Sequence, residues 1–230
     1  MSALGRGAWT TTGKDNGTAD FVYIAGKPLD GSNPTKDFNY QAVNLGVMAI
    51  QKTINAAGYM PALVCDGELG PASSAAIKWF QAKNGLLVDG DCGPKTCRAL
   101  WWSLVGYLER TNNIMGHHLW GIACHESLLD PAAVGYSTPG DRGLVQWNTL
   151  DSGFTVQQAH DPQHALTLAA YRIAGVQKLY AGKGPLLQAN CSIAQWNSPL
   201  WADQWYQTGV APNTQIATYV KDVLAMANTY

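Results

Sequence analysis

The sequence contains no run of about 18 uninterrupted apolar residues, the length that a membrane-spanning helix requires, so we expect no membrane insertion. It also lacks an excess of positive charge. The formal net charge is -1, and a chain without a basic field attracts phosphate groups poorly, so we expect no nucleic-acid partner. Residues 1–17 lack a basic start followed by an apolar run, and the sequence therefore predicts no secretion signal.

Cysteine is sparse, and its spacing gives no CxxC pair of the kind found in zinc sites. Because the number of cysteines is odd, at least one thiol is unpaired within a monomer, and one or two disulfides remain open. A phosphate loop, a dinucleotide-binding fingerprint and a Gly-x-Ser-x-Gly elbow are all missing. We expect no metal and no organic cofactor. The five cysteines are Cys65, Cys92, Cys97, Cys124 and Cys191.

Apolar residues make up 47% of the 230-residue chain and charged residues 13%, a composition typical of a folded protein with one large domain or two smaller ones. Helix-spaced apolar residues recur in both halves, so we predict a mainly α fold. The nine tryptophans and ten tyrosines are many for this length. Such side chains usually fill a core, and they also form faces for carbohydrate or peptide ligands.

The clearest internal pattern is a short repeat. "DGELGPAS" at 66–73 recurs 23 residues later as "DGDCGPKT" at 89–96. Asp-Gly suits a tight turn, and Gly-Pro suits a helix entry with proline in the first turn. Apolar helix patterns surround both copies, which predicts a compact three-helix unit over residues 40–108. These patterns are Val47, Ile50, Ile54 and Ala57, then Ala76, Ile77 and Phe80, then Leu100, Leu104, Tyr107 and Leu108.

The repeat resembles the peptidoglycan-binding domain of many cell-wall hydrolases. That family has two turn-helix repeats with a DGxxGxxT core and an xxFQxxxGL tail, and the tail here is "WFQAKNGL" at 79–86. The resemblance covers most of the three-helix unit and implies bacterial peptidoglycan as the partner. Ser73 replaces a threonine in the first copy. Cys92 stands where the family usually has an apolar residue, which makes a disulfide worth testing.

Residues 1–39 differ from the rest because turn formers dominate them, with "FVYIAG" at 21–26 as a predicted short strand. No chemistry can be assigned to this N-terminal arm. It either covers the binding domain or attaches to a partner.

The second half is predicted to be helical again. Asp161-Pro162 is a typical helix start, and Gly182 and Gly184 are expected to follow the end of that helix. The positions expected to be buried are Leu166, Ala169, Ala170, Ile173, Val176 and Leu179 in this helix, and Ile216, Val220 and Val223 in a last helix.

Glu126, within "GIACHESLLDP" at 121–131, is the leading candidate for catalysis. It lies one turn after Ile122 and shortly before Asp130-Pro131, where a helix is expected to end. The negative end of a helix dipole and partial burial both disfavour a carboxylate, so we expect a raised pKa for Glu126. A carboxyl that keeps its proton near neutral pH is suited to protonate the leaving oxygen of a glycosidic bond.

Glu126-Ser127 and three later segments resemble, in order and spacing, the soluble lytic transglycosylases, which share a lysozyme-like fold with goose-type lysozymes. The segments are "GDRGLVQWN" at 140–148, "AHDPQHALTLAAY" at 159–171 and "SIAQWNSPLW" at 192–201. In that family Glu-Ser ends a helix and is followed by GLMQ, a packing helix and Tyr-Asn. Valine replaces methionine in the second motif, and Trp196-Asn197 occupies the place of Tyr-Asn.

The resemblance implies a role for each matching residue. Glu126 would act first as the acid and then as the base. Because an indole N–H donates but cannot accept or ionise, any role of the missing phenol oxygen must move elsewhere, and Tyr171 and Tyr206 are candidates. The residues implied to bind substrate are Ser127, Gln146, Trp196 and Asn197.

The number of carboxyl groups separates two possible reactions. A lytic transglycosylase needs one, because the 6-hydroxyl of the sugar closes an anhydro ring. A hydrolase needs a second carboxylate to activate water. Asp141 and Asp151 are the candidates for that second carboxylate, and each also suits a turn.

Three other interpretations stay open. "HESLL" at 125–129 begins like the HExxH motif of zinc peptidases but ends in Leu129, so the second ligand is missing. Cys124 directly precedes His125 and Glu126, which raises a cysteine amidase as a second interpretation, although adjacent helix residues point in different directions. The third interpretation is a wall-binding structural protein whose lysozyme-like half is catalytically silent.

Together these patterns predict a peptidoglycan-degrading glycosidase, a muramidase or a lytic transglycosylase, that cleaves the β-1,4 bond between N-acetylmuramic acid and N-acetylglucosamine. The expected domains are the arm at 1–39, a peptidoglycan-binding domain at 40–108 and a lysozyme-like catalytic domain at 109–230. A wall-degrading enzyme without a secretion signal suggests a phage endolysin, present in the host cytoplasm and then at the wall. A virion-associated lysin that contacts phage tail proteins is the alternative.

Overall fold

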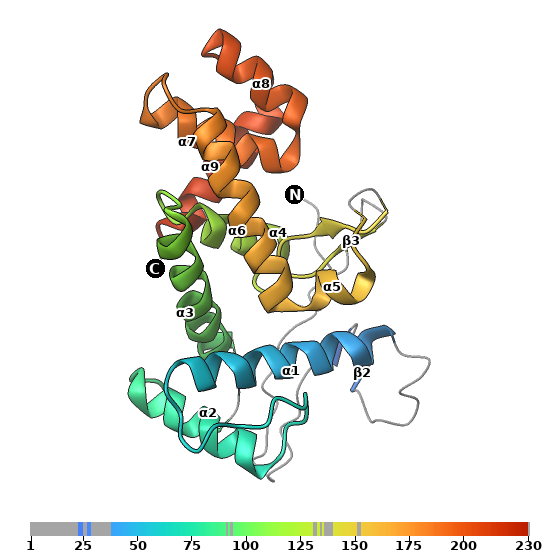
Figure 1. The fold of residues 1–230 in the computed structure, drawn as a ribbon. Coiled ribbons are helices and arrows are strands. Elements are labelled where there is room, and N and C mark those ends of the chain that lie inside the picture. The colour runs from blue at the N-terminus through green and yellow to red at the C-terminus, as the bar shows by residue number, and fades with distance from the viewer. Residues whose placement is uncertain are drawn as a thin grey trace. The chain divides into compact units, whose positions relative to one another are not determined.

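The computed structural model describes residues 23–24, 27–28, 38–90, 92, 94–130, 133, 135, 140–150 and 153–229. Over these residues the chain is mainly helical, as the sequence predicts, and the strands form two short hairpins (Figure 1). Contacts divide the chain into two compact units: Met1–Leu104 with Leu129–Ala165, and Val105–Leu128 with Leu166–Tyr230. The domain limits at residues 39 and 108 remain predictions.

The first unit contains the predicted three-helix pattern. It begins with a hairpin of β1 (Tyr23–Ile24) and β2 (Lys27–Pro28), so part of the predicted strand at 21–26 is present. The helices that follow are α1 (Phe38–Ala56), α2 (Pro71–Lys83) and α3 (Pro94–Asn112), whose last turns belong to the second unit. The predicted core positions Val47, Ile50, Ile54, Ala76, Ile77, Phe80 and Leu100 are buried.

A buried glutamine holds the first repeated turn in place. Gln51 of α1 is 1% exposed. Its amide nitrogen donates to Asp66 Oδ1 at 2.8 Å and to Ser73 Oγ at 3.0 Å, and its carbonyl accepts from the N–H of Gly67 at 3.0 Å. One side chain thus joins the Asp-Gly turn to the first turn of α2.

Gln81 of α2 holds the second turn in the same way. Its amide nitrogen donates to Asp89 Oδ1 at 2.7 Å and to Thr96 Oγ1 at 3.0 Å, and its carbonyl accepts from the N–H of Gly90 at 2.9 Å. We call Gln51 and Gln81 the glutamine clamps. The repeat seen in the sequence is therefore a repeat of hydrogen bonding as well as of turn residues.

The rest of the first unit is a small hairpin and a short helix. β3 (Asp141–Arg142) pairs antiparallel with β4 (Trp147–Asn148). α5 (Val156–His160) follows and begins with a capping box, in which Thr155 Oγ1 accepts from the N–H of Gln158 and the side chain of Gln158 accepts from the N–H of Thr155.

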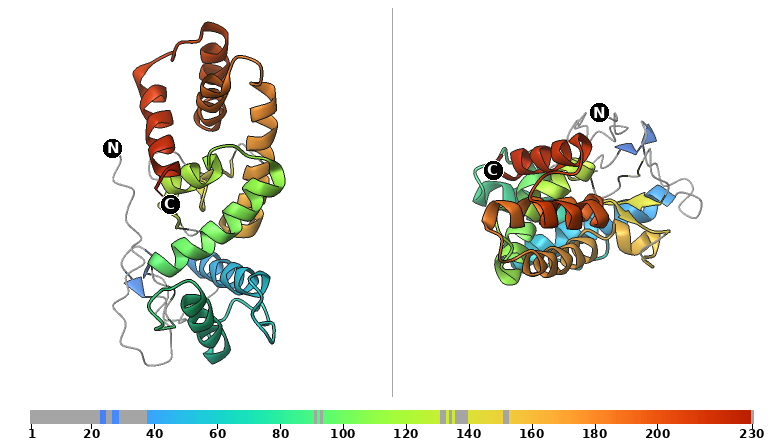
Figure 2. Two further views of the ribbon diagram at one scale, coloured as in Figure 1. Left: turned by 90° about the vertical axis from the view of Figure 1, so that its left-hand side faces the viewer. Right: turned by 90° about the horizontal axis from the view of Figure 1, so that it is seen from above.

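The second unit is helical. Its helices are the end of α3, α4 (His118–Ser127), α6 (Pro162–Leu179, from Leu166 onward), α7 (Pro185–Asn197), α8 (Pro199–Thr208) and α9 (Thr214–Ala227). α9 packs against α4 and α7, and α7 also packs against α8. Figure 2 shows these helices from two further directions. Within the described part of the chain, no helix is both long and apolar enough to cross a membrane.

Most of the predicted core of the second unit is buried, but two predicted positions are wrong. Leu179 is 64% exposed, because α6 ends there and the adjacent Tyr180 takes the buried position. Tyr107 of α3 is also exposed. Leu179 lies at the end of α6, whereas Tyr107 lies within α3 between the buried residues Val105 and Leu108, which face the core in its place.

Gly121 allows α4 and α9 to approach each other closely. A Cβ atom at this position would lie 2.5 Å from the carbonyl oxygen of Val223 and 3.1 Å from the Cβ of Ala227. No other residue type fits this contact without a shift of one helix, so the glycine sets the spacing of the pair.

A buried polar cluster lies between α3, α4 and α6. His118 is buried, and Gln177 Nε2 donates to its Nδ1 at 3.0 Å. Burial lowers the pKa of His118 to about 4, with the neighbouring His117 acting in the same direction. Burial raises the pKa of Glu109, although His117 Nδ1 at 2.9 Å and the N–H of Trp120 partly offset this.

Because His118 is neutral in the folded state, its contribution to stability is complete above pH 6.5 and is lost as the pH falls toward 4. The difference between the two pKa values corresponds to about 3 kcal/mol. In His118→Asn, whose side-chain oxygen can still accept from Gln177, this loss should be absent. The measurement is chemical unfolding of both proteins at pH 7 and pH 4.5, and equal changes in the free energy of unfolding would contradict a buried neutral histidine.

Candidate functional sites

Glu126 lies in the last turn of α4, near the helix end that the sequence predicts. The helix ends at Ser127, and Leu128 then adopts a left-handed conformation with φ 56°. Ile122 and Ala123, one turn earlier, are completely buried, whereas Glu126 is half-buried. Glu126 therefore lies at the edge of an apolar core.

Tyr219 of α9 is the hydrogen-bond partner of this carboxyl. Its hydroxyl donates to Glu126 Oε1 at 2.6 Å, and the residue is 8% exposed. Burial raises the pKa of Tyr219 well above its usual value, the charge of Glu126 and the hydrogen bond to it raise the pKa further, and the charge of Arg172 opposes them. Tyr219 thus keeps its proton near neutral pH and acts as a donor.

Trp196 is linked to this pair through Arg172. The guanidinium of Arg172, on α6, lies 4.9 Å from the centre of the Trp196 ring and donates to the carbonyl of Gln195 at 3.2 Å. The charge of Arg172 also acts on Tyr219. The structure therefore brings Trp196, Arg172, Tyr219 and Glu126 into one connected group.

The sequence did not identify Tyr219. Of the candidates for a phenol oxygen, Tyr171 is exposed, and Tyr206 donates to the carbonyl of Ala181 at 3.1 Å. The signal for Tyr219 was its place beside Val220 on the buried face of the last helix. A tyrosine there needs a partner for its hydroxyl, and a carboxyl is a suitable one.

Three of the predicted substrate-binding residues, Ser127, Trp196 and Asn197, lie in the same unit as Glu126. Ser127 is buried, and its hydroxyl donates to the carbonyl of Ala123 within α4 at 3.1 Å. Asn197 is exposed at the end of α7. Their roles in substrate binding stay predictions, as does that of Trp196.

Gln146 and Asp141 belong to the β3–β4 hairpin of the first unit. Gln146 Nε2 donates to the carbonyl of Gly143 at 2.9 Å, which closes the turn, and Asp141 Oδ1 accepts from Asn148 Nδ2 at 2.9 Å. Both contacts are internal to the hairpin. Asp151, the other predicted second carboxylate, lies outside the described residues.

Cys124 and His125, the residues behind the rival enzyme classes, pack within the second unit. Cys124 is buried. The ring of His125 packs edge-on against the ring of Tyr219, with the ring centres 4.7 Å apart. Burial lowers the pKa of His125, and the charge of Asp222 opposes this shift. Among the described residues, no group of three or more histidine, cysteine, aspartate or glutamate side chains is arranged to hold a metal ion.

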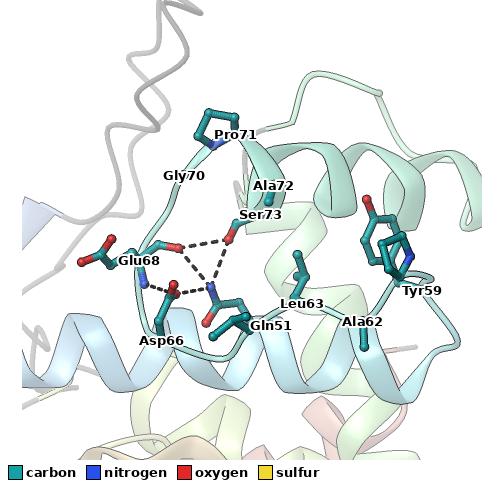
Figure 3. A pocket seen from close by; sticks show the side chains of 12 residues that line it. Gln51, Tyr59, Ala62, Leu63, Asp66, Glu68, Gly70, Pro71, Ala72 and Ser73 are labelled. Atoms are coloured by element: carbon teal, nitrogen blue, oxygen red, sulfur yellow. Dashed lines mark hydrogen bonds between the residues drawn. The ribbon is translucent and has the colours of Figure 1, made fainter.

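A pocket of about 370 Å³ lies over the first glutamine clamp (Figure 3). Gln51 and Ser73, at its base, are buried, whereas Val64 and Glu68 on its rim are exposed. The pocket combines an apolar wall with a few polar groups, the usual make-up of a ligand site. The lining residues are Gln51, Tyr59, Pro61, Ala62, Leu63, Val64, Asp66, Glu68, Gly70, Pro71, Ala72 and Ser73.

An aromatic pair borders this pocket. Tyr59, in the lining, meets Trp79 of α2 edge-on, with ring centres 5.4 Å apart. Lys83 Nζ lies 4.8 Å from the Trp79 ring and donates to the carbonyl of Ala57 at 2.8 Å. These contacts fix the aromatic side chains next to an accessible hollow, so they cost little further entropy when a ligand binds.

The turn between β3 and β4, residues 143–146 with the sequence Gly-Leu-Val-Gln, depends on Gly143. Its φ is 75°, and a Cβ atom there would overlap the carbonyl oxygen of Ala159. Gly143→Ala should therefore destabilise the protein by about 3 kcal/mol or more. Gly153→Ala is the matched control, because φ is 71° there and a Cβ would meet nothing within 4 Å. Urea unfolding should show a much larger loss for Gly143→Ala, and equal losses would contradict the close contact.

Comparison with known proteins gives one match. No curated protein and no solved structure matched the chain. Residues 44–100, which contain both glutamine clamps and the pocket over the first of them, match the model of the family described as "Putative peptidoglycan binding domain". The match supports a peptidoglycan-binding domain in this part of the chain, as its repeat predicts, and through it association with the bacterial cell wall.

Proposed function

We propose that this protein is a peptidoglycan-degrading glycosidase that cleaves the β-1,4 bond between N-acetylmuramic acid and N-acetylglucosamine, with Glu126 as general acid and base. The observation that carries the proposal is the Tyr219–Glu126 hydrogen bond of 2.6 Å at the edge of an apolar core. The peptidoglycan-binding domain supports it by directing the chain to the same polymer. Anchoring to an insoluble substrate raises the effective concentration of the enzyme at its bonds.

The proposed chemistry needs a carboxyl that is held in one orientation. Glu126 donates its proton to the glycosidic oxygen, and the carboxylate then takes a proton from the attacking hydroxyl. Tyr219 keeps its own proton throughout, because burial and the nearby carboxylate both raise its pKa. Its hydrogen bond limits rotation of the carboxyl and so removes part of the entropy barrier.

The attacking hydroxyl distinguishes two forms of this reaction. If it is the 6-hydroxyl of the sugar, the enzyme is a lytic transglycosylase and needs no second carboxylate. If it is water, the enzyme is a lysozyme and needs an assisting carboxylate. Asp141 accepts a hydrogen bond from Asn148, and both forms of the reaction stay within the proposal. The masses of the products decide between the two.

We propose a phage endolysin as the setting, which acts on the wall after release from the host cytoplasm. A virion-associated lysin with phage tail partners is the alternative, and it would use the same acid. The other alternative is a silent wall-binding protein. The buried tyrosine donor favours an active enzyme over a silent protein, because a silent protein has no need of an oriented, half-buried carboxyl.

Glu126→Gln should abolish glycan cleavage and leave wall binding unchanged, because the amide keeps the size of the side chain but cannot supply the proton. The assay is release of soluble fragments from purified bacterial sacculi, with their masses determined by mass spectrometry. Anhydro-muramyl products indicate a transglycosylase, and products heavier by one water indicate a lysozyme. Normal lysis by this variant would refute the assignment, and new free amino groups would show peptide or amide cleavage instead.

Tyr219→Phe should lower the rate of cleavage by about tenfold to a hundredfold, because it removes one hydrogen bond to a charged group. Tyr206→Phe is the matched control. It also removes a phenol hydroxyl, but that hydroxyl donates to the carbonyl of Ala181. Equal rates for the two variants would mean that Tyr219 does not act on Glu126 during the reaction.

We propose that the pocket over the first clamp is where the binding domain holds peptidoglycan. Val64→Asp, which puts a charge on its apolar rim, should weaken binding to sacculi by about tenfold or more. Leu87→Asp is the matched control, since Leu87 occupies the corresponding position of the second repeat and is equally exposed, at 80% against 78%. Co-sedimentation with sacculi measures both, and a stronger effect of Leu87→Asp would place the ligand on the other repeat.

A further inference from the structure

Two buried cysteines in the second repeat take no part in the proposed functions. The sulfur atoms of Cys92 and Cys97 lie 3.3 Å apart, and the residues are 2% and 3% exposed. The thiol of Cys97 also donates to the carbonyl of Cys92 at 2.9 Å. Because a disulfide has a bond length of about 2.05 Å, the two sulfur atoms need to approach by only about 1 Å.

The pair belongs to the second repeat alone. In the first repeat, Leu69 corresponds to Cys92 and Ser74 corresponds to Cys97. The second repeat therefore has two thiols at positions where the first repeat has an apolar side chain and a hydroxyl. Leu69 and Ser74 are both half-buried, whereas the two cysteines are almost completely buried. The second turn thus has the same clamp as the first and, in addition, two sulfur atoms in contact.

We propose that Cys92 and Cys97 form a disulfide that joins the second repeated turn to the first turn of α3. Thr96, next to Cys97, accepts a hydrogen bond from the amide nitrogen of Gln81 at 3.0 Å. The N–H of Gly90, two residues before Cys92, donates a hydrogen bond to the side-chain carbonyl of Gln81 at 2.9 Å. The bond therefore closes the same turn that the second glutamine clamp closes. It restricts the unfolded chain and stabilises the binding domain.

The bond forms by exchange with a small disulfide such as oxidised glutathione. The thiolate of one cysteine attacks a sulfur of the reagent, forms a mixed disulfide and releases one glutathione thiolate. The thiolate of the other cysteine then attacks the protein sulfur of the mixed disulfide and releases the second glutathione. The two cysteines are oxidised by two electrons, and the reagent is reduced to two glutathione molecules. Since both sulfur atoms are buried, the exchange is slow and requires local opening of the turn.

The test uses the complete protein, incubated either with oxidised glutathione or with dithiothreitol, then unfolded, alkylated and digested with trypsin. Trypsin cuts after Lys83, Lys95 and Arg98, so the proposed bond joins the peptide 84–95 to the peptide 96–98. We expect this linked pair, lighter by two hydrogen atoms than the separate peptides, only in the oxidised sample. Alkylated Cys92 and Cys97 after oxidation, glutathione retained on either, or a bond from Cys92 to another cysteine would each overturn the proposal.

The expected effect on stability has its own control. Cys92→Leu/Cys97→Ser gives the second repeat the residues of the first. Oxidation should raise the unfolding midpoint of the natural chain by about 5 °C and leave that of the double variant unchanged. An equal shift in both proteins, or none in the natural chain, would show that the pair does not stabilise the domain.

Discussion

The peptidoglycan-binding domain depends on a buried glutamine side chain whose amide nitrogen and carbonyl oxygen both form hydrogen bonds. A buried glutamine that lost its acceptors would leave polar atoms unpaired, at a cost of about 1–3 kcal/mol, so the turn and the helix entry must both be in place. Gln51 and Gln81 impose this condition twice along the chain. The Asp-Gly and Gly-Pro pairs are the residues that let the backbone satisfy it.

Because the clamps fix the turns, each turn can carry a different feature beside its clamp. Over Gln51 there is a pocket with an accessible apolar rim, and beside Gln81 there are two sulfur atoms in contact. The two copies of the repeat have thus kept the buried amide and changed what surrounds it.

The sequence predicted those parts of the molecule that depend on local pattern. The repeat, the helix starts at Pro71 and Asp161-Pro162 and the helix end after Glu126 follow from turn and capping chemistry that acts over a few residues. Tyr219 could not be found in this way, since 93 residues separate it from Glu126 and only the packing of α9 on α4 brings them together. The clamps were missed for a related reason. A glutamine on an apolar helix face gives no sign of its partners until the turn is folded.

The close contact at Gly121 couples the two ends of the second half of the chain. The backbone of α9 contacts α4 at Gly121, about one and a half turns before Glu126. The position of α9 along α4 therefore determines the distance between the hydroxyl of Tyr219 and the carboxyl of Glu126. A tag or fused domain that pulls on the last helix would shift this register without altering any residue near the acid.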